Sequence, residues 1–394
     1  NQLDQTTDSW AVFGQSTWNM TDTTRLTFGL RYTEEDKGAY QLAHAGDFVE
    51  RNKEPSLNPL VNAISQTVLE FTNHSFNPSD PGMTRNEDSL TWSLNMQHNL
   101  SKNNMIYASA STGFKAGGYN SWFMGQAGGL GADSLDASFD EEEVLTYELG
   151  SKMLFLRGAA EVNVAYFHMK YDDLQAAIFN GNTSFVVQNA AKATSQGVEI
   201  DARWRATENI TFAGSLGWVD FKFDEFPNQA CTSDQFIASR EAAYQAALNG
   251  PGGVPEAAGV SLLYIPPHCS EAGVNDLKGR TSANTPEYQA NLLANYFLPL
   301  GSYDLDFTLN LNWSDTAYRQ DDLDPIALSD ELLTVNLTIV LGNEEGLWDV
   351  ALIGKNITDE VSSNWSNDTP LFPGSHDYTM NPPRSFELRA RMHF

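Results

Sequence analysis

The sequence predicts an all-β fold, an antiparallel transmembrane β-barrel, on three observations. Apolar and polar residues alternate along about thirteen segments, as side chains do when the two faces of a strand meet different surroundings. The connections between these segments alternate between short turns and long loops. No uninterrupted apolar run approaches the roughly 18 residues that a membrane helix needs. A soluble β-sandwich also has alternating strands, but its long loops occur at both ends, so the asymmetry favours the barrel.

The first third of the chain sets the rhythm of strand, tight turn, strand and long loop. In the segment Ser89–Leu100, Trp92, Leu94 and Met96 alternate with polar residues, so one face of that strand is apolar. A short turn at 101–104 leads to the next strand, and the Gly- and Asp-rich stretch at 125–140 is predicted to be an exposed loop. The strands predicted in this third are Ser9–Met20, Arg25–Tyr40, Ser89–Leu100 and Met105–Asn120.

The same rhythm continues to the end of the chain. Between residues 198 and 205, four apolar residues alternate with four charged ones. Aromatic residues gather near strand ends, as in the girdles at the two interfaces of a membrane barrel, although core packing explains single cases equally well. The remaining predicted strands are Glu143–Leu156, Ala160–Asn180, Phe185–Ala206, Ile210–Phe226, Pro286–Leu298, Tyr303–Gln320, Leu332–Leu341, Trp348–Val361 and Ser385–Phe394.

The last strand shows the alternation most clearly. Its even positions are all apolar, and its odd positions from 387 to 393 are charged or titratable. We expect the even face to meet lipid and the odd face to meet the lumen, where Arg389 and Arg391 can pair with charges such as Glu199 or Asp201. The apolar positions of this strand are Phe386, Leu388, Ala390, Met392 and Phe394.

The charge of the chain excludes some partners. It carries 51 acidic residues against 23 lysines and arginines, a formal net charge of −28. Such a charge repels nucleic acid and anionic membrane surfaces, so no nucleic-acid partner is expected. It suits long external loops on a barrel or a soluble secreted protein.

Two long loops are predicted to contain short helices. Asn58 and Pro59 precede an apolar stripe that ends at Val68, and Ser233–Leu248 has a second apolar face that stops at Gly250-Pro251. Cys231 and Cys269 flank the second helix, and a disulfide between them would tie the external loop together. The alternative is two unpaired thiols.

No catalytic constellation is present in the sequence. The seven histidines lack metal-ligand spacing, and the glycine-rich run at 113–118 lacks the strand–loop–helix setting of a nucleotide site. Acidic clusters at 140–143 and at Asp321, Asp322 and Asp324 could hold a divalent cation. They lack calcium-loop spacing, and such clusters are more often solvated loop surface. We therefore expect no enzyme, no cofactor and no resident metal.

Five segments resemble the motifs of one protein family. The first contains Gly-Phe-Lys-x-Gly, the second Tyr-Glu-Leu-Gly, the third ends in Gly-Val-Glu, the fourth is Asn-Ile-Thr-Asp, and the fifth is the last strand with its preceding Pro-Pro-Arg. Together they resemble TonB-dependent outer-membrane receptors. In chain order these segments are 107–120, 139–152, 189–200, 354–359 and 382–394.

The resemblance implies a barrel of about 22 strands, plugged by an N-terminal domain, in the outer membrane of a Gram-negative bacterium. It implies uptake of scarce nutrients, most often ferric siderophores, driven by the TonB complex, with lipid and lipopolysaccharide around the barrel. No plug and no TonB-binding segment precede Asn1, so residues 1–394 are expected to be a partial barrel domain, about thirteen strands of the 22. A complete barrel of about 12 to 16 strands is the alternative architecture. The barrel-assembly signal implied by the family is Phe386, Leu388, Met392 and Phe394.

The ligand is left open by the sequence. Aromatic and arginine side chains near the loops suit an anionic catecholate complex, whereas oligosaccharide or cobalamin uptake is also compatible. A passive porin-like channel and a soluble secreted carbohydrate-binding protein are the rival functions. The ligand-contact candidates are Trp122, Phe123, Tyr244, Tyr264 and Arg319.

Overall fold

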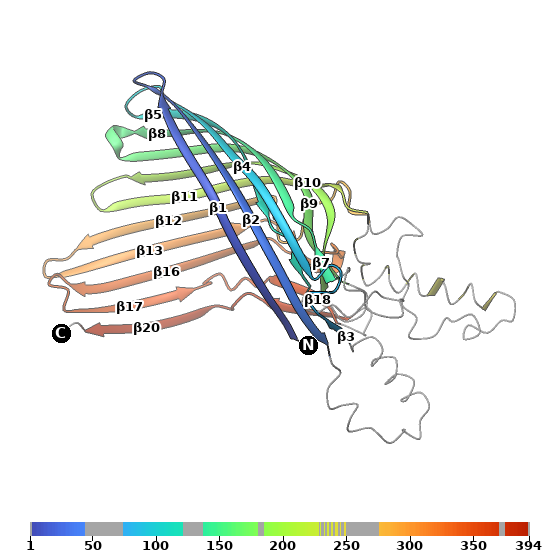
Figure 1. Cartoon of the computed structure of the whole chain (residues 1–394). Helices are drawn as coiled ribbons and strands as arrows, with labels where there is room; N and C mark the ends of the chain where they lie inside the picture. The colour runs from blue at the N-terminus through green and yellow to red at the C-terminus, as the bar shows by residue number, and fades with distance from the viewer. Residues whose placement is uncertain are drawn as a thin grey trace.

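The computed structural model describes residues 2–43, 74–120, 137–179, 185–227, 276–369 and 375–392, together with single positions between 229 and 249. These residues form a strongly curved, open wall of antiparallel strands (Figure 1). Within the described ranges, no helix has both the length and the apolar character needed to span a membrane.

The main sheet has 14 strands, and thirteen of them follow one another in chain order, with only the short β3 (His74–Phe76) lying off the path beside β2. This confirms the all-β antiparallel fold and the thirteen predicted segments. The strands of the path are β1 (Gln2–Asn19), β2 (Thr24–Ala43), β4 (Thr84–Asn99), β5 (Asn104–Lys115), β8 (Glu142–Phe155), β9 (Ala160–Phe179), β10 (Phe185–Arg205), β11 (Ile210–Glu225), β12 (Tyr288–Pro299), β13 (Tyr303–Ser314), β16 (Leu332–Asn343), β17 (Trp348–Lys355) and β20 (Ser385–Met392).

The connections alternate between the two ends of the wall, as predicted (Figure 1). The short ones lie at 20–23, 100–103, 156–159, 206–209, 300–302 and 344–347, and the turn at 156–159 contains the short helix η2 (Leu156–Gly158). The path from β1 to β20 contains thirteen antiparallel strands, an odd number, so β1 and β20 run in the same direction, from the loop end to the turn end. We call the two ends of the sheet the turn end and the loop end.

Three small hairpins in the long connections were not predicted. They are β6 (Gly118–Tyr119) with β7 (Ser138–Phe139), β14 (Ala317–Tyr318) with β15 (Leu328–Ser329), and β18 (Ser363–Asp368) with β19 (His376–Met380). The short helix η5 (Pro325–Ala327) lies between β14 and β15. These strands are too short, or too polar on both faces, to show a period of two.

Several predicted strand ends were wrong because the chain bends. The segment Met105–Asn120 divides into β5 and β6, and Tyr303–Gln320 divides into β13 and β14. The segment Trp348–Val361 stops at Lys355, since Asn356 takes a left-handed conformation with φ of 46°.

The predicted helix over Ser233–Leu248 is helical at each of its described positions, 235, 238, 241, 242, 245 and 248. Its start follows a reciprocal capping pattern. The Gln235 backbone N–H donates to the Thr232 hydroxyl at 3.3 Å, and the Thr232 backbone N–H donates to the Gln235 amide oxygen at 3.0 Å. The helix expected near Asn58 to Val68 lies outside the described residues.

One face of the sheet carries a continuous apolar band. Register places apolar residues opposite apolar residues from strand to strand, as in Phe28 opposite Leu94 and Leu352 opposite Leu388. Large side chains on this face are exposed, which suits hydrocarbon rather than water. They include Trp10, Trp18, Phe28, Leu94, Leu149, Trp204, Leu216, Leu292, Leu352 and Leu388.

The opposite, inner face carries hydroxyls and amides that bond to one another. The Asn291 amide donates to Asn312 Oδ1 at 2.6 Å, and the Asn295 amide donates to the Thr308 hydroxyl at 2.8 Å. The pattern across β12 and β13 is that of a wet interior behind a lipid-facing surface.

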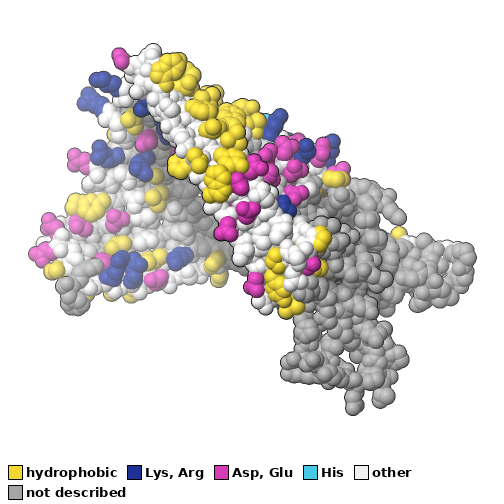
Figure 2. Space-filling view, in the orientation of Figure 1, with side chains coloured by type: hydrophobic (Ala, Val, Ile, Leu, Met, Phe, Trp, Pro, Cys, Tyr) yellow, Lys and Arg dark blue, Asp and Glu magenta, His cyan; other side chains and the backbone are white. Residues whose placement is uncertain are grey.

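The strands are longer than a membrane crossing requires. About 9–11 residues span a bilayer, whereas β1 has 18 residues and β2 has 20. Apart from Leu3, the apolar residues of β1 begin at Trp10, and the part nearer the loop end is otherwise polar on both faces, so the sequence prediction began this strand at Ser9 instead of Gln2. Figure 2 shows hydrophobic side chains gathered over the turn-end part of β1 and β2, with acidic ones towards the loop end.

The closely packed apolar clusters of the described chain lie at the loop end. One contains Ala39, Phe76, Met83, Tyr119 and Ala137. The other joins β10 and β11 to loop residues and contains Ala191, Ala193, Phe223, Phe226, Leu277 and Leu323. These clusters, rather than a central core, hold the long connections against the sheet.

The last strand has the two faces that the sequence predicted. Leu388 is 75% exposed and faces outward, whereas Arg389 lies opposite the buried Ala351 of β17. Arg391 pairs with Asp349, its register partner in β17, at 3.5 Å, and not with Glu199 or Asp201, which lie on β10 several strands away.

We expect Leu388→Arg to impair barrel assembly far more than Arg389→Leu. An arginine on the lipid face costs about 2–4 kcal/mol at the midplane, whereas a leucine on the inner face meets no hydrocarbon penalty. The measurement is the folded fraction in outer membranes, read from heat-modifiable migration in gels. Equal effects of the two substitutions would contradict this facing.

Candidate functional site

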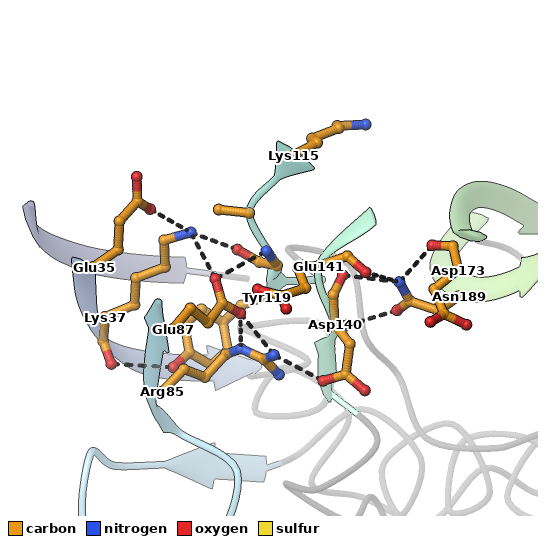
Figure 3. A network of polar contacts seen from close by, with 12 residues as sticks. Glu35, Lys37, Arg85, Glu87, Lys115, Tyr119, Asp140, Glu141, Asp173 and Asn189 are labelled. Atoms are coloured by element: carbon orange, nitrogen blue, oxygen red, sulfur yellow. Dashed lines mark hydrogen bonds and ion pairs between the residues drawn. The ribbon is translucent and has the colours of Figure 1, made fainter. Parts of the chain in front are cut away.

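A buried polar network occupies the inner face at the loop end of β2 and β4 (Figure 3). Glu87 lies at its centre. Its carboxylate accepts from Arg85 at 2.7 Å and from the Gly117 backbone N–H at 3.1 Å, and it lies 3.6 Å from the Lys37 ammonium. Lys37 also donates to the Gly117 carbonyl at 2.6 Å and pairs with Glu35 at 3.0 Å. Because Glu35 is the register partner of Glu87, Lys37 separates two like charges.

The network fixes the chain after β5, where it folds inward. The Arg85 guanidinium also pairs with Asp140 at 2.7 Å. Gly117, just before β6, and Asp140, just after β7, are therefore held by Glu87 and its partner Arg85. A Cβ on Gly117 would lie within 2.5 Å of Glu87 Oε1, and one on Gly118 would lie 2.8 Å from the Phe139 ring. The glycine-rich run is therefore required for close packing, not for a nucleotide.

The same inward segment bridges distant strands. Gln41 of β2 donates to the Asn120 carbonyl at 3.1 Å, and the Asn120 side chain exchanges two hydrogen bonds with the Val187 backbone of β10, at 2.7 and 3.1 Å. Strands β2 and β10 are separated in the sheet by β4, β5, β8 and β9. Residues 117–120 thus cross the inner side of the curved sheet and narrow its loop end.

Asn189 of β10 connects its own strand to two other segments beside this bridge (Figure 3). Its amide donates to the backbone carbonyls of Asp140, Glu141 and Asp173 at 2.9–3.1 Å, and its oxygen accepts from the Asp140 N–H at 2.6 Å. The asparagine amide provides both donors and an acceptor, and its side chain is shorter than that of glutamine, the other amide side chain.

Two of the family-like segments meet through Tyr107. Its hydroxyl donates to Glu148 by a short hydrogen bond, and its ring lies where a Cβ on Gly150 would clash. The late segments meet in the same way. Asp359 pairs with Arg384 at 3.2 Å, and the Asn356 amide donates to the Pro382 carbonyl at 3.1 Å.

A second polar cluster lies in the β14–β15 connection. Asp322 and Asp324 are buried, and the Gln320 amide donates to Asp322 at 3.1 Å. Burial, together with the negative charges of Asp368, Asp324 and Asp321, raises the pKa of Asp322 to about 8. Asp322 and Asp324 of the predicted acidic cluster are therefore buried, not solvated loop surface, whereas Asp321 is exposed.

Of the five predicted ligand-contact residues, one, Arg319, lies within the described part of the chain. Arg319 directly follows β14, and its guanidinium donates to Asn284 at 3.2 Å. Burial lowers the pKa of this arginine. Its role as a ligand contact stays a prediction. Trp122, Phe123, Tyr244 and Tyr264, the cysteines Cys231 and Cys269, and Phe394 of the assembly signal lie outside the described residues.

A curved antiparallel sheet with an apolar outer face, short turns at one end and long, inward-folded connections at the other matches a known barrel domain. The family model for the TonB dependent receptor-like β-barrel matches residues 1–357. The chain belongs to this family. Its members are outer-membrane proteins of Gram-negative bacteria and function as transport receptors, so the expected localisation is confirmed.

Solved structures have the same fold at low identity. The ferric yersiniabactin uptake receptor FyuA from Yersinia pestis superposes with a TM-score of 0.66 at 17% identity, over 99% of this chain and 46% of that one. The siderophore receptor PiuA from Acinetobacter baumannii gives 0.65 at 16% identity, over 98% and 43%.

Curated relatives match over shorter stretches. The pesticin receptor of Yersinia pestis is 26% identical over 215 residues, 54% of this chain and 25% of that receptor. The metal-pseudopaline receptor CntO of Pseudomonas aeruginosa is 28% identical over 125 residues, 32% of this chain and 16% of that receptor. These matches span a quarter or less of the curated receptors, and this chain covers less than half of either solved structure.

We expect Lys37→Met to lower the free energy of unfolding by about 3 kcal/mol. Breaking a buried ion pair costs about 3–5 kcal/mol, and the lower end applies because Glu87 keeps Arg85. The control is Lys192→Met, whose partner Asp172 is exposed, so the loss of that pair should hardly change the free energy of unfolding. Urea unfolding in detergent or lipid measures both. Equal losses of unfolding free energy in the two variants would mean that the Lys37 network does not stabilise the fold.

We expect Asn189→Asp to loosen the β6–β7 connection, at a cost of at least about 2 kcal/mol. The carboxylate cannot donate to the three carbonyls, which are left without that partner. Hydrogen exchange of the amides at 138–141 and 187–189 would report the local opening. Gln188→Glu, which adds the same charge at the exposed neighbouring position, should leave this exchange unchanged.

Proposed function

We propose that the protein containing this chain is an outer-membrane active-transport receptor for a scarce nutrient, a ferric siderophore, with energy from the TonB complex. The family match over residues 1–357 carries this proposal. Relatives named as receptors for ferric yersiniabactin, for siderophores and for metal-pseudopaline support the ligand class. The lipid-compatible outer face argues against a soluble secreted carbohydrate-binding protein.

In this proposal, residues 1–394 supply part of the barrel wall. This chain covers between 38% and 50% of the matched receptor structures, and the uncovered parts would supply the plug, the remaining strands of about 22 and the contact with TonB. Lipid and lipopolysaccharide would surround the apolar band.

The ligand would be captured at the loop end and pass through the lumen once the plug is remodelled. The inward bridge at 117–120 supports this arrangement, because it places ordered backbone across the mouth between β2 and β10. Trp122 and Phe123 follow this bridge in the chain, Tyr244 and Tyr264 belong to the longest connection, and Arg319 follows β14. Aromatic and guanidinium groups together suit a catecholate complex.

We expect a strain lacking this receptor to regain growth under iron limitation when the full-length protein is supplied together with one class of ferric siderophore. Uptake of radioactive iron should be abolished by removing TonB. Growth on no member of a catecholate, hydroxamate and carboxylate panel would contradict the iron proposal. Open conductance by the purified full-length protein in a planar bilayer would favour a passive channel instead.

We expect alanine at Trp122, Tyr244 or Arg319 to weaken ligand binding by about tenfold each, roughly the 1.4 kcal/mol of one interface contact. The amount of receptor in the outer membrane should not change. Tyr303→Ala, an exposed aromatic at the turn end, is the control and should bind normally. Unchanged Kd values in all three loop variants would refute these contacts.

A further inference from the structure

Two of the unpredicted hairpins touch each other at the loop end. The Ser366 backbone N–H of β18 donates to the Arg319 carbonyl at 3.3 Å, and the Tyr378 hydroxyl of β19 donates to the Ile326 carbonyl at 3.3 Å. The β14–β15 connection and the β18–β19 hairpin are therefore neighbours, although about 40 residues separate them in sequence.

Three metal-ligating side chains converge between these hairpins. Asp368 and His376 are register partners at the end of β18–β19 where the chain connects the two strands, and Asp324 comes from the β14–β15 connection. One ligand atom from each lies within 4.8 Å of the other two. Asp324 is 2% exposed, and the His376 side chain is 6% exposed.

His376 and Asp368 lie within ion-pair distance of each other without forming a hydrogen bond. His376 Nδ1 lies 3.0 Å from Asp368 Oδ1, yet both buried atoms lack a hydrogen-bond partner within the described part of the chain. Buried polar atoms are normally satisfied. Two donor atoms about 3 Å apart, each about 2.0–2.2 Å from one ion, occupy adjacent positions of a single coordination sphere.

The concentration of carboxylates around this site also favours the binding of a cation. Asp322 is surrounded by the negative charges of Asp321, Asp324 and Asp368. Buried carboxylates are stable when they are paired or coordinate a metal, because desolvation penalises an isolated charge.

We propose that Asp324, Asp368 and His376 bind one divalent first-row transition ion, with Zn²⁺ as its representative, and that this ion joins the two hairpins. The imidazole selects Zn²⁺, Fe²⁺, Ni²⁺ or Cu²⁺ over Ca²⁺ and Mg²⁺, which take oxygen ligands. The ion is a structural component of the loop end and is independent of the nutrient that the receptor transports.

The simpler alternative is an ion pair between a protonated His376 and Asp368, without metal. It predicts no tight binding of Zn²⁺, and it predicts that chelators have no effect on the hairpins. The two arrangements therefore differ in a direct measurement.

The experiment is Zn²⁺ titration of the full-length protein in detergent, after chelator treatment, by calorimetry and by metal analysis. We expect one Zn²⁺ per chain that Asp368→Asn, Asp324→Asn and His376→Gln each weaken by at least about 100-fold, since even partners beyond the ligands cost about 10–100-fold. Asp377→Asn is the matched control, because Asp377 is the exposed neighbour of His376. It should bind as the wild type does.

A second variant tests ligation directly and does not depend on loss of binding. His376→Cys keeps a zinc ligand, and its Co²⁺ form should show a sulfur-to-cobalt charge-transfer band that the wild type lacks. Heat-modifiable migration checks that each variant is folded. Wild-type affinity in the three ligand variants, absence of tight Zn²⁺ binding, or a Co²⁺ spectrum of the Cys variant without the sulfur band would overturn the proposal.

Discussion

The hydrogen-bond ladder between neighbouring strands is the constraint on which the rest of this structure depends. Within hydrocarbon no water satisfies the backbone, so each N–H and C=O must find a partner on the next strand. A register that satisfies the ladder also fixes which side chains face lipid, because successive side chains point to opposite faces. The pairing of Leu292 with Leu311 and of Asn291 with Asn312 on adjacent rows is one result of this rule.

A sheet with lipid on one face and a wet lumen on the other has no place for a central apolar core. Stability at the loop end must therefore come from small clusters and from polar contacts. Asn189 and Asn356 are such contacts, each bonding several backbone groups, and Glu87 joins the Gly117 N–H to the side chains of Arg85 and Lys37. The family-like segments contain or adjoin these residues. Their similarity to the family thus reflects how strands and connections are joined, not what the receptor binds.

The same constraint explains which features the sequence could predict. All thirteen long strands were recognisable, because their alternation extends over eight or more residues. The hairpins β6–β7 and β14–β15 have two residues per strand and no detectable period. Their contacts are with residues distant in sequence, such as Arg85 and Glu87 for β6–β7 and Ser366 for β14–β15. The ligand-contact candidates were chosen from residue type alone, since loop side chains follow no period. Asp322 and Asp324 were recognised as a cluster, but their burial depends on Leu323 and Phe226, which lie almost a hundred residues apart.

The distribution of charge along the strands follows the change from hydrocarbon at the apolar band to water at the loop end. The outward-facing residues of the turn-end halves are largely uncharged, and acidic residues are concentrated where β1, β2 and β4 continue beyond the apolar band. Basic groups there are few, and Lys37 and Arg85 are already engaged by carboxylates. A chain with a net charge of −28 must therefore stabilise its buried carboxylates by other means, such as amide donors, protonation or a bound cation. At Asp324, Asp368 and His376, one ligand atom of each side chain lies within 4.8 Å of the other two, and in our proposal a divalent ion supplies the missing positive charge.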